Sequence, residues 1–198
     1  DGVIPMLPPG LSNELCSLKP HLERPTISVL IDYDFNGNVL NHRIFNSLIK
    51  SCQRVTYNEA WQLIQNSDPN SEYPDIFPSL KLMHQLSRVL RKKRIQGGSV
   101  DFYIPEPAIQ VGSSGQVEKV TMVENNEAHQ LVEEFMLAAN CVVAKYLKDR
   151  KIPAIHRIHL APDPIKLKGL NSYLEILGLH TLQTNSLKTS DLQNLLKN

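Results

Sequence analysis

The chain has 198 residues, of which 41% are hydrophobic, and its formal net charge is +1. This balance gives no overall basic field of the kind that points to nucleic-acid binding, although it leaves room for a local basic groove. The chain has three cysteines without CxxC spacing, which favours reduced thiols in a cytoplasmic protein over a disulfide scaffold or a zinc site. No apolar run is long enough to cross a membrane.

The N-terminal segment, VIPMLPPGLSNELCSLKP, holds four prolines in 18 residues. Proline removes a backbone donor and fixes φ, so this composition predicts an ordered loop rather than a helix or a central strand. The sequence opens at Asp1 and has no methionine before Met6. We therefore expect it to be an internal piece of a longer protein.

A hairpin and a short helix are predicted next. Residues 26–35 read as a strand, Asn-Gly within 36–38 as the turn, and a return strand runs from Val39 into the fifties. The segment TYNE, residues 56–59, has the pattern of a capping box, which predicts that a helix begins at Tyr57.

Helical spacing of apolar residues predicts a second helix over 79–95, ended by Gly97 and Gly98. Residues 99–123 then read as strand, turn and strand around GSSG, and a long helix follows over about 126–148.

The C-terminal part begins with PAIHRIHLAP, residues 153–162, which resembles one more strand. Asp163, Pro164 and Gly178 bracket a helix, and a final short helix is predicted within 190–198. The order of hairpin, two helices, hairpin, helix, strand and helix predicts an α+β fold. We expect a mixed, largely antiparallel sheet with packed helices.

Two adjacent acids, Glu133 and Glu134, precede the run 135–144, in which Asn140 is the only polar residue. A helix that is apolar on all sides is expected to be covered on all sides, so this half of the helix is predicted to lie in a core. At least one of the two carboxylates should then lie at the rim of that core and accept a hydrogen bond from a nearby donor. The alternative is a pair of solvated acids that favour the helix dipole.

Five segments occur in an order and spacing that resemble a known family: VIPMLPPGLSNELCSLKP, RVTYNEAW, GSVDFYIPE, AHQLVEEFMLAAN and IPAIHRIHLAPDPIKL. They are similar to the catalytic (RNB) domain of the ribonuclease II / ribonuclease R family of processive 3′-to-5′ exoribonucleases. The ribonuclease R branch is the more similar. The resemblance covers essentially the whole chain, and it implies that residues 1–198 are the central part of one such domain.

The resemblance implies a narrow channel that admits single-stranded RNA. At its end, aspartates would hold Mg²⁺, and a metal-activated water would release nucleoside 5′-monophosphates. It further implies a cytoplasmic protein, expected to be monomeric, with no membrane partner and no small-molecule cofactor.

Three substrate-binding residues follow from the resemblance. Phe102 matches an aromatic residue that stacks on terminal bases, and Tyr57 matches a tyrosine that contacts the 3′-terminal nucleotide. Glu133 matches a glutamate that acts with this tyrosine at the terminal ribose, where a carboxylate can accept a hydrogen bond from the 2′-hydroxyl. Without the family, packing is the favoured role for both aromatics, with Phe102 in the core of a hairpin and Tyr57 in the first turn of a helix. Glu134 could be the structural member of the acid pair.

Weaker candidates have plainer alternatives. Arg157 could meet a phosphate or form an ion pair at a strand end, and the cluster RKKR, residues 91–94, could guide the RNA backbone or be a solvated helix face. His129 is expected to be a surface or capping residue rather than a metal ligand.

The family's metal-binding aspartates and its phosphate-stabilising arginine segment are not found in this sequence, and Asp32 and Asp34 do not match the aspartate cluster. Tyr103 and Pro25 are local departures from the family pattern. We therefore assign no catalytic residue to this chain and expect the segment alone to be inactive. The alternatives are a catalytically inactive RNA-binding paralogue and a protein-interaction domain that reuses the fold.

Overall fold

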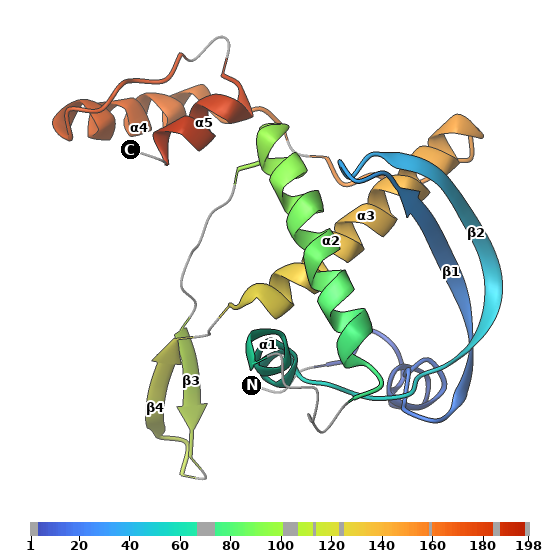
Figure 1. The fold of residues 1–198 in the computed structure, drawn as a ribbon. Coiled ribbons are helices and arrows are strands. Elements are labelled where there is room, and N and C mark those ends of the chain that lie inside the picture. Colours follow the sequence, from blue (N-terminus) through green and yellow to red (C-terminus); the bar gives the residue numbers. More distant parts are fainter. Residues whose placement is uncertain are drawn as a thin grey trace. The chain divides into compact units, whose positions relative to one another are not determined.

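The computed structural model describes residues 4–66, 74–100, 107–112, 114–122, 125–158, 160–183 and 187–196 (Figure 1). The chain divides into two units. The first consists of Asp1–Ser87 and Asn126–Arg150, and the second of Arg88–Asn125 and Lys151–Asn198. In the described parts of the chain, no helix is long and apolar enough to span a membrane.

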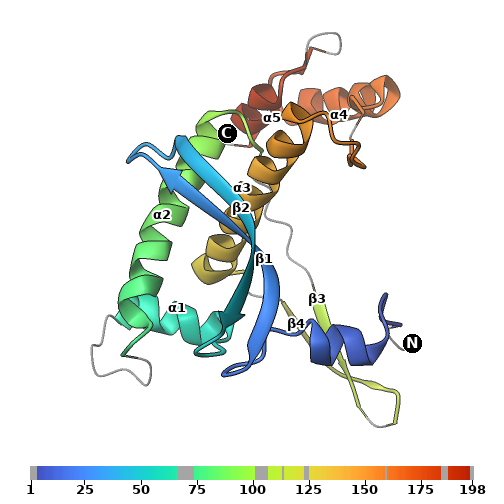
Figure 2. The same cartoon turned by 90° about the vertical axis from the view of Figure 1, so that its right-hand side faces the viewer.

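The first unit contains the predicted long hairpin. Strand β1 (Glu23–Tyr33) pairs antiparallel with β2 (Val39–Lys50), with a register irregularity near the turn, and both strands curve strongly (Figure 2). The Asp34 carboxylate closes the turn by accepting from the backbone N–H groups of Asn36 at 2.9 Å and Asn38 at 2.7 Å. Gly37 adopts φ 74°, as the Asn-Gly turn requires.

Helices α1, α2 and α3 belong wholly or partly to the first unit. Helix α1 (Tyr57–Asn66) begins at the predicted residue, and α3 (Glu127–Asp149) follows the predicted cap at Asn126. Helix α2 (Phe77–Gln96) begins in the first unit, continues into the second, and ends at the predicted glycine pair, where Gly98 has φ 94°.

The N-terminal loop prediction was wrong for residues 10–15. A short π-helix (Gly10–Leu15) lies there, with the Cys16 N–H donating to the Leu11 carbonyl at 2.9 Å. The three nearest prolines all precede it, and the next is Pro20, so the segment itself keeps its backbone donors.

The second unit contains another hairpin, β3 (Pro107–Val111) with β4 (Val117–Met122), whose turn holds Gly115 at φ 77°. The predicted strand–turn–strand is confirmed here, although residues 101–106 lie outside the described part. The α+β fold class is also confirmed. The described strands form two separate two-stranded antiparallel sheets rather than one sheet.

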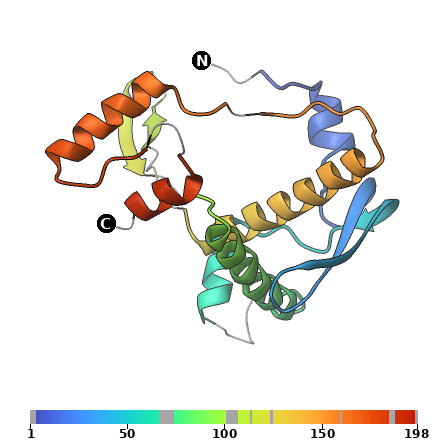
Figure 3. The same ribbon diagram turned by 90° about the horizontal axis from the view of Figure 1, so that it is seen from above.

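Helices α4 (Pro164–Ile176) and α5 (Thr189–Leu195) lie beside each other in the second unit (Figures 1 and 3). Asp163 caps α4 by accepting from the Ile165 N–H at 2.8 Å. At the other end, Gly178 has φ 68°, and its N–H donates to the Glu175 carbonyl at 3.0 Å. Both predicted ends of α4 are confirmed.

The strand predicted over 153–162 was wrong for the described residues, which have no regular secondary structure there. Alternation shows which side chains share a face of an extended segment, but a strand also needs a neighbouring backbone to pair with. The prolines at both ends, Pro153 and Pro162, remove two donors from that pairing.

The core prediction for 135–144 was also wrong within this chain. Val142 is buried at 6% exposure, whereas Met136 is 60% exposed. The inner face of α3 is instead marked by Ala128, Leu131 and Glu134, each 3% exposed.

Candidate functional site

Tyr57 is the first residue of α1, and the capping box before it fixes where that helix begins. The Glu59 carboxylate accepts from the Thr56 backbone N–H and from the Thr56 hydroxyl, both at 2.7 Å. These hydrogen bonds lower the pKa of Glu59, and the one from the backbone N–H contributes most. The resulting negative charge lies at the positive end of the helix dipole. The Tyr57 side chain is thereby held at the helix start, where it is 45% exposed.

Helix α3 begins in the same unit with a cap of its own. The Asn126 side chain accepts from the backbone N–H groups of Ala128 at 3.1 Å and His129 at 3.4 Å. In return, the Asn126 N–H donates to Nδ1 of His129 at 3.3 Å. His129 therefore takes the place that Glu or Gln usually has in a capping box. One of its two predicted roles, that of a capping residue, is confirmed.

The two capped helix starts meet through their side chains. The ring of Tyr57 stacks on the imidazole of His129, with 3.9 Å between ring centroids and 22° between ring planes. Next to this stack, the Asn126 side-chain amide donates to Oδ1 of Asn58 at 3.3 Å. Two consecutive residues of α1 thus contact two residues of the α3 cap.

The acid pair divides between two environments. Glu134 is 3% exposed and shares the inner face of α3 with Leu131, whereas Glu133 is exposed. Glu133 follows His129 by four residues, so the two side chains lie on one face of the helix, with Cβ atoms about 5–6 Å apart. We call Tyr57, Asn58, Asn126, His129 and Glu133 the α1–α3 junction.

The part of helix α2 that belongs to the first unit supports this junction. Nε2 of His84 pairs with the carboxylate of Glu127, the first residue of α3. The indole of Trp61, one turn after Tyr57 on α1, meets the His84 ring edge-on, with 6.3 Å between centroids and 64° between planes. All three helices are therefore linked by side-chain contacts close to the stacked rings.

The structure places two of the predicted substrate residues in the same unit. Tyr57 stacks on His129, and Glu133 lies four residues after His129 on α3. Phe102 lies outside the described residues. Arg157 is exposed and belongs to the second unit, so the structure does not join it to the junction.

Sequence reasoning missed the ring contact of His129. Its position one turn before Glu133 in HQLVEE was the available signal. The spacing within one helix could not show that the α1 tyrosine lies opposite.

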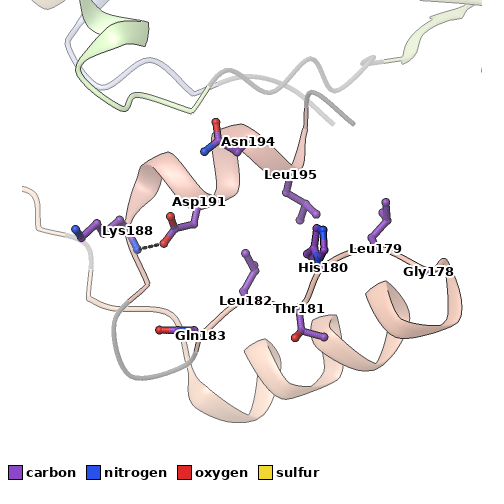
Figure 4. Close-up of a pocket in the computed structure, with 10 residues that line it drawn as sticks. All are labelled: Gly178, Leu179, His180, Thr181, Leu182, Gln183, Lys188, Asp191, Asn194 and Leu195. Atoms are coloured by element: carbon purple, nitrogen blue, oxygen red, sulfur yellow. Dashed lines mark hydrogen bonds between the residues drawn. The ribbon is translucent and has the colours of Figure 1, made fainter.

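An open hollow of about 810 Å³ lies in the second unit, between the segment after α4 and helix α5 (Figure 4). Asn171 fixes its wall, accepting from the Leu182 N–H and donating to the Leu182 carbonyl, both at 2.8 Å. The hollow is lined by Gly178, Leu179, His180, Thr181, Leu182, Gln183, Lys188, Asp191, Asn194 and Leu195. None of the predicted site residues is among them, so the α1–α3 junction is the candidate site.

The described residues do not fit a magnesium site. Among them, no three His, Cys, Asp or Glu side chains come together in a way that could hold a metal ion. Asp34 is engaged in the hairpin turn, and Asp32 accepts from the Asn41 side chain at 3.4 Å. What this segment can offer chemically is an aromatic face and a hydrogen-bond acceptor.

The sequence matches the RNB domain family over residues 1–198. The chain belongs to this family. Ribonuclease R of Aquifex aeolicus is 38% identical over 180 residues, which is 90% of this chain and 25% of the relative. Ribonuclease R of Escherichia coli is 31% identical over 196 residues, which is 98% of this chain and 24% of the relative. The chain thus spans about a quarter of the length of these curated relatives.

Two solved structures have a similar fold. The structure of Mycoplasma genitalium RNase R in complex with ribose methylated single-stranded RNA matches with a TM-score of 0.89 and 28% identity, covering 98% of this chain and 30% of that one. Yeast Ssd1, described as a pseudonuclease, matches with a TM-score of 0.62 and 16% identity over 91% of this chain and 22% of its own. This second likeness concerns the fold alone. The predicted family resemblance is confirmed.

Proposed function

We propose that the complete protein is a processive 3′-to-5′ exoribonuclease that hydrolyses single-stranded RNA to nucleoside 5′-monophosphates. In this proposal, residues 1–198 are the central part of its catalytic domain, and the protein acts as a monomer in the cytoplasm. Family membership over the whole chain and relatives named ribonuclease R support the activity. A similar structure that holds single-stranded RNA supports the substrate.

The α1–α3 junction is the observation that carries the role of this segment. Tyr57 offers a half-exposed ring, and Glu133 an exposed carboxylate one turn beyond the histidine that backs this ring. In the proposed complex, Tyr57 contacts the 3′-terminal nucleotide and Glu133 accepts a hydrogen bond from its 2′-hydroxyl. DNA lacks this hydroxyl, so the acceptor makes the site selective for ribose.

Two further contacts belong to the proposal. Phe102 stacks on bases near the 3′ end, which suits an enzyme that digests every sequence, because stacking tolerates any base. Arg157 meets a backbone phosphate. Hydrolysis would depend on a divalent metal ion, Mg²⁺, held by residues outside this chain, so this segment contributes substrate binding and no step of the metal chemistry.

A catalytically inactive RNA-binding protein is the second candidate. The same fold occurs in yeast Ssd1, which is described as a pseudonuclease, so the fold by itself is compatible with a loss of catalysis. In a protein of this kind, the junction would bind an RNA end without cutting it.

The test uses the complete protein and a single-stranded RNA labelled at its 5′ end, with and without a chelator. An exoribonuclease shortens the RNA progressively from the 3′ end and releases nucleoside 5′-monophosphates, and both processes stop when the chelator is present. Binding without shortening supports the second candidate. A protein with neither affinity nor activity would contradict both and leave a protein-interaction domain as the explanation.

A further inference from the structure

We propose that His129 is a positioning residue that fixes the Tyr57 ring and thereby sets how strongly the junction distinguishes a ribose end from a deoxyribose end. This inference rests on the proposed function. Under it, the histidine touches neither the RNA nor the metal ion, and it acts only through the tyrosine.

The stacking geometry is the first step of the argument. A tyrosine in the first turn of a helix, with its side chain 45% exposed, is free to change rotamer unless something holds one face of its ring. The His129 imidazole lies at 3.9 Å and 22° from that ring and covers one face. The tyrosine is therefore backed on one side while the residue stays 45% exposed.

The second step is that the imidazole is itself held in place. Its Nδ1 contacts Asn126 twice, at 3.3 Å from the backbone N and 3.0 Å from the side-chain Oδ1, and the Asn126 side-chain amide donates to Asn58, the neighbour of Tyr57, at 3.3 Å. If the ring turned away, its contact with Asn126 in the capping box would be lost. Gln at this place could complete the same capping box but would supply no ring, so the histidine adds the stack to the cap.

The third step connects the stack to the acid. His129 and Glu133 are four residues apart on α3, hence on one face of a rigid helix. A tyrosine held by His129 keeps a constant position relative to the helix that carries the acceptor. Under the proposed function, Tyr57 and Glu133 contact the same terminal nucleotide at the same time, which requires such a fixed separation.

Two variants of the complete protein separate the ring of His129 from its capping nitrogen. His129→Gln keeps a side chain that can complete the cap and removes the ring, whereas His129→Phe keeps a ring and removes the acceptor nitrogen. Each is compared with wild type on two single-stranded RNAs that differ only in a 2′-deoxy sugar at the last position. The measurements are the ratio of kcat/KM for the ribose end to that for the deoxyribose end and, with a chelator present, the ratio of Kd for the deoxyribose end to that for the ribose end.

We expect His129→Gln to lower both ratios roughly three- to tenfold, the range of one misplaced hydrogen bond. His129→Phe should keep both ratios closer to wild type than His129→Gln does, even if its Tm falls because the contact between Nδ1 and Asn126 is lost. A purely structural role for His129 predicts the reverse order, with the Phe variant impaired and the Gln variant normal. That order, or a wild-type ratio in His129→Gln, would overturn the inference.

Tyr57→Ala, measured in parallel, shows whether the positioning role of His129 or the proposed function of the junction has failed. If it lowers the ratios and His129→Gln does not, the positioning role is wrong and the proposed function stands. If Tyr57→Ala has no effect in a protein that degrades RNA, the junction is not the ribose site. Because the Kd ratio needs no catalysis, the positioning role is decided even if the protein binds RNA without cutting it.

Discussion

Glu133 and Glu134 are neighbours in the chain, but about 100° of rotation per helical residue gives them different surroundings. Glu134 is 3% exposed on the inner face of α3, and Glu133 is exposed on the face that also carries His129. The burial of Glu134 suits a structural acid, and the exposure of Glu133 suits an acid that meets a ligand. This difference in exposure supports the division of roles that we propose for the pair.

Replacing each acid in turn tests that division. In the complete protein, Glu133→Ala should relax discrimination against a 3′-terminal deoxyribose several-fold, because the acceptor for the 2′-hydroxyl is lost. Glu134→Ala, the matched control, should leave discrimination unchanged and destabilise the protein by about 1–3 kcal/mol, because it empties a buried position. The two readouts are cleavage of RNAs with ribose or deoxyribose ends and thermal unfolding. The assignment of Glu133 fails if its variant still rejects the deoxyribose end as strongly as wild type.

Phe102 provides a second test at this scale. Phe102→Ala should weaken binding of single-stranded RNA by about 1–3 kcal/mol, the contribution expected for one stacked base. Because stacking does not depend on base identity, the loss should be similar for poly(A) and poly(U). Affinities measured by fluorescence anisotropy would show this, and a loss confined to one sequence would indicate a different kind of contact.

At the scale of the element, helix ends were the features that local sequence predicted best. The capping box at Thr56 placed the start of α1 correctly, and Asp163 with Gly178 placed both ends of α4. These signals are local because the groups involved are within a few residues of each other. A strand over 153–162 would have needed a pairing strand from elsewhere in the chain. The stack of Tyr57 on His129 likewise needs a ring from another helix. No local pattern could identify that partner.

The cap of α1 should respond to pH. Hydrogen bonds from Thr56 lower the pKa of Glu59 below its ordinary value of 4.5. A carboxylate with a depressed folded-state pKa stabilises the fold above its unfolded-state value and loses that contribution as the pH falls through the folded-state pKa. Wild type should therefore be more stable than Glu59→Gln at pH 7, and the difference should shrink below about pH 4.5. Unfolding of both proteins between pH 3 and pH 7 is the measurement, and a constant difference would contradict it.

Two glycines of the α4 region should respond oppositely to alanine. Gly178 has φ 68°, so Gly178→Ala should cost about 1 kcal/mol from backbone strain alone, since no atom lies within 4 Å of the added methyl group. Gly169 lies inside α4 and also has room for a methyl group. Gly169→Ala should stabilise by about 0.5–1 kcal/mol through helix propensity. Thermal unfolding of the complete protein compares the two, and effects of the same sign would count against this reading of the helix end.

At the scale of the whole molecule, the chain leaves much apolar surface uncovered. The exposed apolar residues include Met136 on α3 and Tyr173 on α4. Because the chain spans about a quarter of its curated relatives, we expect the remainder of the protein to cover such residues.

The isolated segment should therefore behave differently from the complete protein. We expect it to show no nuclease activity, because the proposed metal ligands lie outside it, and to bind a hydrophobic dye such as ANS strongly. Hydrolysis of single-stranded RNA by the purified segment, abolished by a chelator, would contradict the first expectation. Dye fluorescence no higher than that of the complete protein would contradict the second.

The contact between Tyr57 and His129 also bears on biosynthesis. The two rings are 72 positions apart in the chain (129 − 57), with all of α2 and the second hairpin encoded between them. At about 5–20 residues per second, a ribosome needs roughly 4–14 s to add that stretch. For this period the nascent Tyr57 cannot pack against His129, which has not yet been added. The pairing therefore forms late, and a translational pause within this stretch would lengthen the time during which α1 is open to wrong contacts.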